Sequence, residues 1–372
     1  KSIENNDIFI AEAETGLGKT YGYLIPSLLS PNANIVVSTS THSLQEQLFN
    51  QDIPNLAKSL DLPINASIVK GMRNYLCNFR LDFLVNNLEV LDDDERLELT
   101  SLIVWANDTK TGDISECNGF RLWKYKKIWD LISYNHEFCG LHKNTNDNKC
   151  FYQQLKKEII NSNILIINHS LLASCYDRQD SVIKNRDICV IDEAHKLSEN
   201  CRMHLKKNIN KIYFKGIFES YSYLLSQILN NNKHNKNYKV LYSKNEEIKI
   251  EFINFLKKFD CMSLSFANSK LTNTYNRFNN NIQDIRYKCN EEEFIDINPS
   301  PQIISKLFSS LINSLEHHKE LVNNSNFEHY SKIDKVNYSI TLNNILDTEI
   351  ILSNLFSDNS SNVHWIRISS YK

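Results

Sequence analysis

The stretch that decides the fold is AETGLGKT, which runs from Ala13 to Thr20. The apolar run Ile8–Ala11 precedes it and reads as a strand, and the helical pattern Tyr21–Leu29 follows it. A glycine-rich turn between a strand and a helix is the setting in which a phosphate-binding loop is expected. Gly16 and Gly18 let the backbone turn tightly and point N–H groups at an anion, which the dipole of the next helix also attracts. The stretch therefore predicts an α/β fold with a parallel sheet and a nucleotide site.

Each side chain of this loop has an expected task. Lys19 can reach the β- and γ-phosphates, and the hydroxyl of Thr20 can bind Mg²⁺. The alternative is a glycine-rich turn that carries a lysine by chance. The residues predicted to bind ATP and Mg²⁺ here are Thr15, Gly16, Leu17, Gly18, Lys19 and Thr20.

A second motif, VIDEAH, spans Val190 to His195 and ends the apolar run Ile188–Ile191. A carboxylate at the C-terminal end of a parallel strand lies at the edge of the sheet where ligands bind. We expect Asp192 to hold Mg²⁺ and Glu193 to orient and deprotonate the attacking water. His195 is expected to couple the nucleotide state to nucleic-acid binding. Read alone, the motif could be two solvated acids and a surface histidine.

The rest of the chain divides by composition. Short apolar runs at Ile35–Ser38 and Ile164–Ile167 are further strand candidates, whereas the region between them holds four cysteines and looks like an insertion. Long helical patterns dominate after Cys201, and Val363–Ile368 alternates like a strand that returns to the sheet. The expected domains are a first lobe at 1–71 and 153–200, insertions at 72–152 and 201–350, and the return strand at 351–372.

Composition narrows the class of protein without naming a partner. The 372 residues carry a net charge of −2, so a nucleic acid would have to bind at local basic patches. No apolar run reaches the roughly 18 residues of a membrane-spanning helix, and no signal peptide is recognisable. Nine cysteines without secretory features indicate thiols in a cytoplasmic protein.

Six segments occur in the order typical of one family. They are EAETGLGKTYGYLIP, STSTHSLQEQLFNQDIP, KGMRNYLC, CFYQQLK, NILIINHSLL and ICVIDEAHKL, all within Ile8–Leu197. Together they resemble the DinG/XPD branch of superfamily 2 helicases, and bacterial DinG most. The resemblance implies a RecA-like P-loop NTPase lobe interrupted by an iron–sulfur insertion and a mostly helical arch. It also implies a monomeric 5′-to-3′ DNA helicase that uses ATP to move along single-stranded DNA in repair or replication.

The same resemblance assigns DNA contacts. Its motif after the second strand places Thr39, Ser40, Thr41 and Gln45 on the DNA backbone, and a polar helix cap is the alternative. In KGMRNYLC, Lys70 and Arg73 could neutralise phosphates while Tyr75 stacks on a base, although a structural tyrosine is equally expected. Asn168 and His169 match the family's N-H pair, for which local hydrogen bonding is the simpler expectation.

The cysteines depart from the family in one place. The family holds a [4Fe–4S] cluster with four thiolates, but its third cysteine is replaced here by Asn144. Cys117 could supply the missing ligand, His142 is a second candidate, and a chain without an intact cluster is the third possibility. Zinc would accept the same ligands, although C-x-x-C pairs are absent. The predicted set is Cys77, Cys117, Cys139 and Cys150.

The sequence contains no recognisable second motor lobe with arginine fingers. We therefore expect a first lobe with its two insertions, which binds nucleotide and single-stranded DNA but does not unwind a duplex. Two alternatives stay open, namely a DEAH-type RNA-remodelling ATPase and a metal-stapled nucleic-acid binding module with a vestigial loop.

Overall fold

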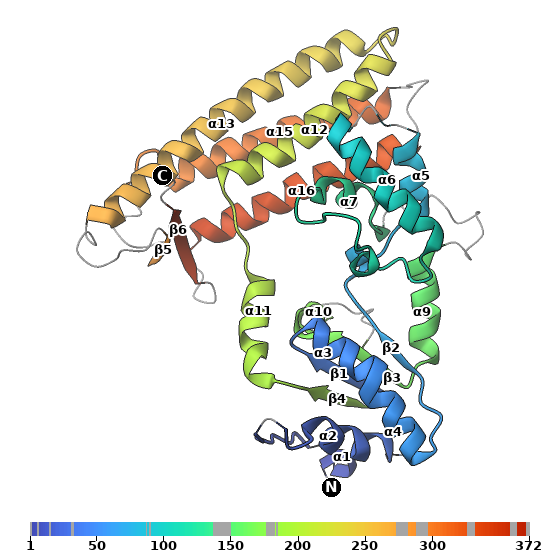
Figure 1. Ribbon diagram of the computed structural model, residues 1–372. Coiled ribbons are helices and arrows are strands. Elements are labelled where there is room, and N and C mark those ends of the chain that lie inside the picture. Colours follow the sequence, from blue (N-terminus) through green and yellow to red (C-terminus); the bar gives the residue numbers. More distant parts are fainter. Residues whose placement is uncertain are drawn as a thin grey trace. The chain divides into compact units, whose positions relative to one another are not determined.

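The computed structural model describes residues 2–5, 7–14, 16–30, 33–86, 88, 91–136, 150–175, 183, 185–272, 282–287, 297–325, 332–357 and 363–369. The chain forms two compact units, Lys1–Lys206 and Lys207–Lys372 (Figure 1). In the described part of the chain, no helix is both long and apolar enough to cross a membrane.

A parallel sheet of four strands organises the first unit. Its strands are β1 (Ile35–Thr39), β2 (Ala66–Ile68), β3 (Ile164–Asn168) and β4 (Ile188–Ile191), in the order β2-β3-β1-β4. Val37 pairs with Ile166 on one side and with Val190 on the other. β1 and β3 are nearly continuous apolar runs because parallel strands are covered on both faces.

Two apolar clusters cover the two faces of this sheet. Ile35, Val37, Ile164 and Ile166 pack with Leu24 on one face, whereas the intervening strand residues pack into a second cluster. The alternation follows from the two-residue period of a strand.

The helices of this part are α1 (Ser2–Asn5), α2 (Lys19–Leu28), α3 (His42–Gln47), α4 (Ile53–Leu60), α10 (His169–Cys175) and α11 (Leu197–Leu205). A π-helical turn, Leu48–Asp52, joins α3 to α4.

The segment between β2 and β3 has an apolar core of its own. Its helices are α5 (Asn78–Val85), α6 (Asp93–Asp108), α7 (Lys126–Ile132) and α9 (Phe151–Asn161), with short 3-10 turns at Met72–Asn74 and Ile114–Glu116. Asp92 and Glu95 form a capping box that starts α6. The Arg121 guanidinium grips the buried Glu98 carboxylate at 2.7 Å and joins α6 to the loop before α7.

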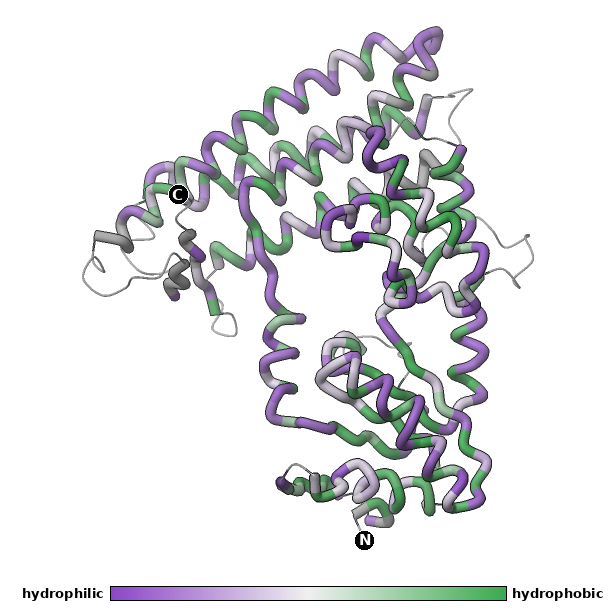
Figure 2. The backbone as a smooth tube through the Cα atoms, viewed as in Figure 1, coloured by the Kyte–Doolittle hydropathy of each residue, from purple (hydrophilic) through white to green (hydrophobic). Residues whose placement is uncertain are grey.

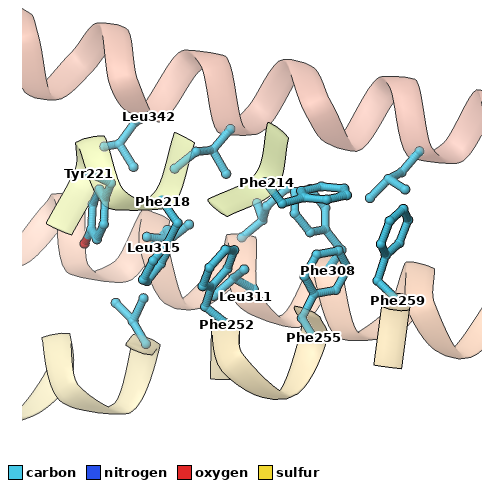
Figure 3. Packing of buried hydrophobic residues seen from close by; sticks show 14 of the residues in the cluster. Phe214, Phe218, Tyr221, Phe252, Phe255, Phe259, Phe308, Leu311, Leu315 and Leu342 are labelled. Carbon is cyan, nitrogen blue, oxygen red and sulfur yellow. The ribbon is translucent and has the colours of Figure 1, made fainter. Parts of the chain in front are cut away.

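The second unit is built on four long helices with an aromatic core. They are α12 (Lys211–Asn231), α13 (Tyr238–Thr272), α15 (Pro301–Asn324) and α16 (Lys332–Phe356). Hydrophobic and hydrophilic residues alternate along these helices, as an amphipathic bundle requires (Figure 2). Phe214 lies among Phe255, Phe259 and Phe308, with ring centroids 4.9 to 5.6 Å away (Figure 3).

The structure differs from the sequence-based expectation for two strands: one does not form, and the other pairs in a different sheet. Residues 7–14 have no regular secondary structure, and Ile8 is 94% exposed, so Ile8–Ala11 is not a strand of the sheet. Val363–Ile368 does predict a strand, but β6 (His364–Ser369) pairs antiparallel with β5 (Ile282–Tyr287) in the second unit and does not return to the sheet. Its alternating pattern suits a two-stranded ribbon, whereas a strand inside a parallel sheet is apolar throughout.

Candidate functional site

The glycine-rich loop leads directly into α2. Gly16 and Gly18 have positive φ angles of 85° and 73°, which glycine adopts without strain, and Gly18 is the N-cap of the helix. Leu17 is 70% exposed at the tip of the loop, whereas Lys19 and Thr20 form the first turn of α2. Thr15 lies outside the described residues. The loop therefore presents backbone N–H groups and the start of a helix, which suit an anion.

The acidic motif follows β4 and meets this loop. The Lys19 Nζ atom lies 3.4 Å from Glu193 Oε1, although the two residues are 174 positions apart. The second oxygen of Glu193, Oε2, lies 3.3 Å from His195 Nδ1. The structure thus brings together the lysine, the expected base and the expected coupling histidine.

The Asp192 side chain is held at both oxygens. Oδ1 accepts a hydrogen bond from the Glu193 N–H at 3.0 Å, and Oδ2 accepts one from the Tyr23 hydroxyl at 3.3 Å. The Asp192 N–H donates to the Ser38 carbonyl at 2.9 Å and fixes the backbone beside β1. The sequence reading did not identify Tyr23. Helical spacing could have found it, because Tyr23 lies one turn after Lys19 on the same face of α2.

A buried histidine lies close to this motif. His169 begins α10, is fully buried, and its Nδ1 lies 2.8 Å from the hydroxyl of Ser38. The pKa of His169 lies below its ordinary value, because the lowering by burial outweighs the raising by the nearby carbonyls of Glu193 and Asp192. Asn168 accepts a hydrogen bond from the Leu171 N–H at 2.7 Å, so local hydrogen bonding is confirmed for this pair.

Two of the expected backbone contacts for DNA are buried. Thr39 is 0% exposed and Gln45 is 1% exposed, and Gln45 Oε1 lies 3.0 Å from His42 Nδ1. The hydroxyl oxygen of Ser40 is also buried, whereas Thr41 is exposed and caps α3 through the Leu44 N–H. Thr39 and Gln45 are thus buried in this conformation, and their contact with a DNA strand stays a prediction. Thr41 can reach a ligand.

The KGMRNYLC segment, residues 70–77, likewise contains both buried and exposed side chains among those expected to contact DNA. Tyr75 is 4% exposed and its hydroxyl accepts a hydrogen bond from the Lys70 N–H at 3.1 Å, so Tyr75 has a structural role, and its stacking on a base stays a prediction. Burial, the leading cause, raises the pKa of this hydroxyl. The Lys70 ammonium is buried against Asp113 at 2.5 Å and is not free for a phosphate. Arg73 is exposed and stays available.

Two of the four predicted cysteine ligands lie near each other. Cys77 precedes α5 and Cys150 precedes α9, each at an N-cap. Burial raises the pKa of Cys77 most, a charge on Cys150 would raise it further, and the N–H groups of Arg80 and Phe79 lower it.

The other predicted ligands do not join this pair in the described structure. Cys117 packs in the apolar core of the insertion, where burial raises its pKa. Cys139, His142 and Asn144 lie outside the described residues. Among the residues that the structure does describe, no three Cys, His, Asp or Glu side chains converge as a metal site.

A parallel sheet, a glycine-rich loop before a helix, and an acidic pair at the neighbouring strand end are consistent with a RecA-like nucleotide-binding lobe. Comparison with protein-family models gives no match. Comparison with known proteins gives ATP-dependent DNA helicases. YoaA of Haemophilus influenzae is 33% identical over 203 residues, which are 54% of this chain and 31% of that protein. YoaA of Escherichia coli is 28% identical over 218 residues, or 56% of this chain and 33% of that protein.

A third relative carries a different name. It is the 3′-5′ exonuclease DinG of Bacillus subtilis, 30% identical over 218 residues, which are 57% of this chain and 23% of that protein. The chain is therefore a homologue of the YoaA- and DinG-type helicases. It spans about a third or less of the length of these relatives.

Proposed function

We propose that this chain forms the ATP-binding lobe of a DinG-type, ATP-dependent DNA helicase. The observation that carries the proposal is the contact of Lys19 with Glu193, 3.4 Å apart and 174 positions apart in sequence, beside an Asp192 held by Tyr23. A loop lysine and a carboxylate pair meet in this way in enzymes that hydrolyse nucleoside triphosphates. The names of the relatives support DNA as the polymer on which the protein acts.

The side chains suggest a division of labour during hydrolysis. The N–H groups at the start of α2 would hold the phosphates, and Lys19 would exchange Glu193 for phosphate oxygens. Asp192 and the Thr20 hydroxyl are oxygen donors of the kind that fit Mg²⁺, which offsets phosphate charge when bound. Glu193, released from Lys19, would accept a proton from the attacking water.

The nucleic-acid side of the proposal rests on exposed groups. Thr41 at the start of α3 and Arg73 in the turn Met72–Asn74 can donate to phosphate oxygens. Movement along single-stranded DNA in the 5′-to-3′ direction, in repair or replication, belongs to this proposal. An RNA-remodelling ATPase is the second candidate, and stronger binding of single-stranded RNA than of DNA of the same sequence would favour it.

An iron–sulfur cluster in the insertion is also part of the proposal. Cys77 and Cys150 fit two of its ligand positions, because each thiol lies at the N-cap of a helix, where N–H groups offset part of the cost that burial imposes on a thiolate. Cys117 does not fit as well, since it lies in an apolar core apart from that pair. Protein purified without oxygen should contain about four irons per chain and lose them in Cys77→Ser. Zinc in place of iron, or no bound metal, would contradict the assignment.

Nucleotide binding by the 372-residue chain tests the proposal. Calorimetry with Mg²⁺ and a non-hydrolysable ATP analogue should give one site per chain. Lys19→Ala should weaken that binding at least about tenfold, because a charge-assisted contact with phosphate contributes roughly 1.5–3 kcal/mol. Lys58→Ala, which removes an exposed lysine from the last turn of α4, is the matched control and should bind as the wild type does. Equal affinity of wild type and Lys19→Ala would refute the proposed site.

A further inference from the structure

Tyr23 lies at the point where the phosphate-loop helix meets the acidic motif. It follows Thr20 by three residues in α2, and its ring packs beside the apolar cluster of Leu24 and Ile35. Its hydroxyl donates to Asp192 Oδ2 at 3.3 Å, across 169 positions of sequence. A tyrosine whose ring is packed in the core holds its hydroxyl in one place.

The hydrogen bonds of Asp192 show what this placement does. The Glu193 N–H occupies one lone pair of Oδ1 and the Tyr23 hydroxyl occupies one lone pair of Oδ2. Each carboxylate oxygen can accept more than one bond, so both keep capacity for an ion or its water. The two hydrogen bonds thereby fix the rotation of the Asp192 carboxylate and leave a lone pair on each oxygen for a metal ion or its water.

The Tyr23 hydroxyl is the donor in this contact, because an ionised carboxylate oxygen can only accept. Thr20, the other residue expected to bind Mg²⁺, precedes Tyr23 by three residues on the same side of α2.

We propose that Tyr23 is a positioning residue, whose hydroxyl holds the Asp192 carboxylate in the orientation that accepts Mg²⁺ with the nucleotide. The inference rests on the proposed function, since it deepens the role of the same site. Removal of a group that orients a metal-binding side chain typically weakens metal binding about 10–100-fold.

Tyr23→Phe tests this inference, because it deletes the hydroxyl and keeps the ring. Mg²⁺ is titrated into the 372-residue chain with a fluorescent ATP analogue, and nucleotide binding is also measured in EDTA. The Mg²⁺ concentration at half-saturation should rise about tenfold, at the lower end of that range, while binding in EDTA stays unchanged. Tyr21→Phe is the control, because Tyr21 lies on the same helix and is 38% exposed. It should titrate as the wild type does.

Three outcomes would go against the inference, and they are distinguishable. A half-saturation in Tyr23→Phe within twofold of the wild type would overturn it. Equal weakening with Mg²⁺ and in EDTA would also overturn it, because the hydroxyl would then support nucleotide binding without acting on Mg²⁺. If the wild type binds no more nucleotide than Lys19→Ala, the proposed function fails, and the role of Tyr23 fails with it.

Discussion

At the scale of single residues, Glu193 combines an unfavourable backbone conformation with contacts to two other residues of the site. Its backbone is left-handed, with φ 54° and ψ 45°, a conformation that costs a residue with a side chain roughly 1–2 kcal/mol. Such strain collects at functional sites and is retained by the surrounding structure. Here the turn directs one carboxylate oxygen at Lys19 and the other at His195.

The same scale shows what the sequence can reveal about a site. Lys19, Asp192 and Glu193 were predictable, because each motif fixes a residue type at a strand end or a helix start. Tyr23 was missed: helical spacing places it on the same face of α2 as Lys19, but its partner Asp192 is far along the chain, so the spacing does not show what its hydroxyl contacts. The sequence left two roles open for Tyr75, because an aromatic ring serves stacking and core packing equally well; in the structure it is buried.

At the scale of elements, strands were harder to place than helices. The apolar runs of β1, β3 and β4 predicted strands of a parallel sheet and these strands exist, although only β1 and β3 are buried, whereas β4 at the edge of the sheet is partly exposed. The pairing of the runs at Ile8–Ala11 and Val363–Ile368 was not predictable, because strand pairing depends on distant parts of the chain and the periodicity of a segment does not specify it. The long helices of the second unit followed from their own period, which is local.

Gly112 provides a prediction for the packing between elements. It has φ 68°, its carbonyl accepts the Leu76 N–H at 2.8 Å, and a Cβ there would lie 2.4 Å from the Phe151 ring at the start of α9. Gly112→Ala should therefore destabilise the first unit by about 2–4 kcal/mol, from strain and overpacking together. Urea unfolding followed by tryptophan fluorescence measures the change.

Gly119→Ala is the matched control, because a Cβ at Gly119 would meet its nearest neighbour, Ser101, at an ordinary 3.8 Å. We expect its unfolding midpoint to stay close to that of the wild type. If both alanine variants unfold like the wild type, the close approach of Gly112 to Phe151 is not what fixes this contact.

His318 provides a prediction for the helical bundle. It is fully buried in α15; its Nδ1 lies 3.2 Å from the Tyr221 hydroxyl and 3.1 Å from that of Tyr338, and its Nε2 lies 3.2 Å from the Leu241 carbonyl. Burial lowers its pKa to about 4. The unfolded chain, with an ordinary pKa near 6.5, binds the proton first, so acid favours unfolding.

This contribution is complete above about pH 6.5 and is lost as the pH falls toward 4. Between pH 7.5 and pH 5 the unfolding free energy should drop by about 2 kcal/mol on account of His318. His318→Gln should remove that part of the pH dependence, whereas His317→Gln, on the exposed side of the same helix, should keep it. Urea titrations by circular dichroism at the two pH values measure it. An identical pH dependence in both variants would show that His318 is not the group that titrates.

At the scale of the whole molecule, the chain combines a parallel sheet that carries the proposed nucleotide site, an inserted cysteine-bearing segment and a helical unit. The order of motifs along Ile8–Leu197 predicted the parallel sheet and the similarity to DNA helicases, because the topology of the sheet sets the order and spacing of those motifs. The second unit has an aromatic core that stabilises it by burial. Homology covers a little more than half of this chain and about a third or less of its relatives.

The most direct test of the ATP site is a crystal structure of the chain with Mg²⁺ and a non-hydrolysable ATP analogue. We expect the phosphates against the N–H groups of Gly16 to Thr20, Lys19 turned from Glu193 to the γ-phosphate, and Mg²⁺ between Thr20 and Asp192. Phosphates bound elsewhere, or a nucleotide that leaves the Lys19–Glu193 contact intact, would contradict the assignment of this loop and this carboxylate pair to ATP hydrolysis.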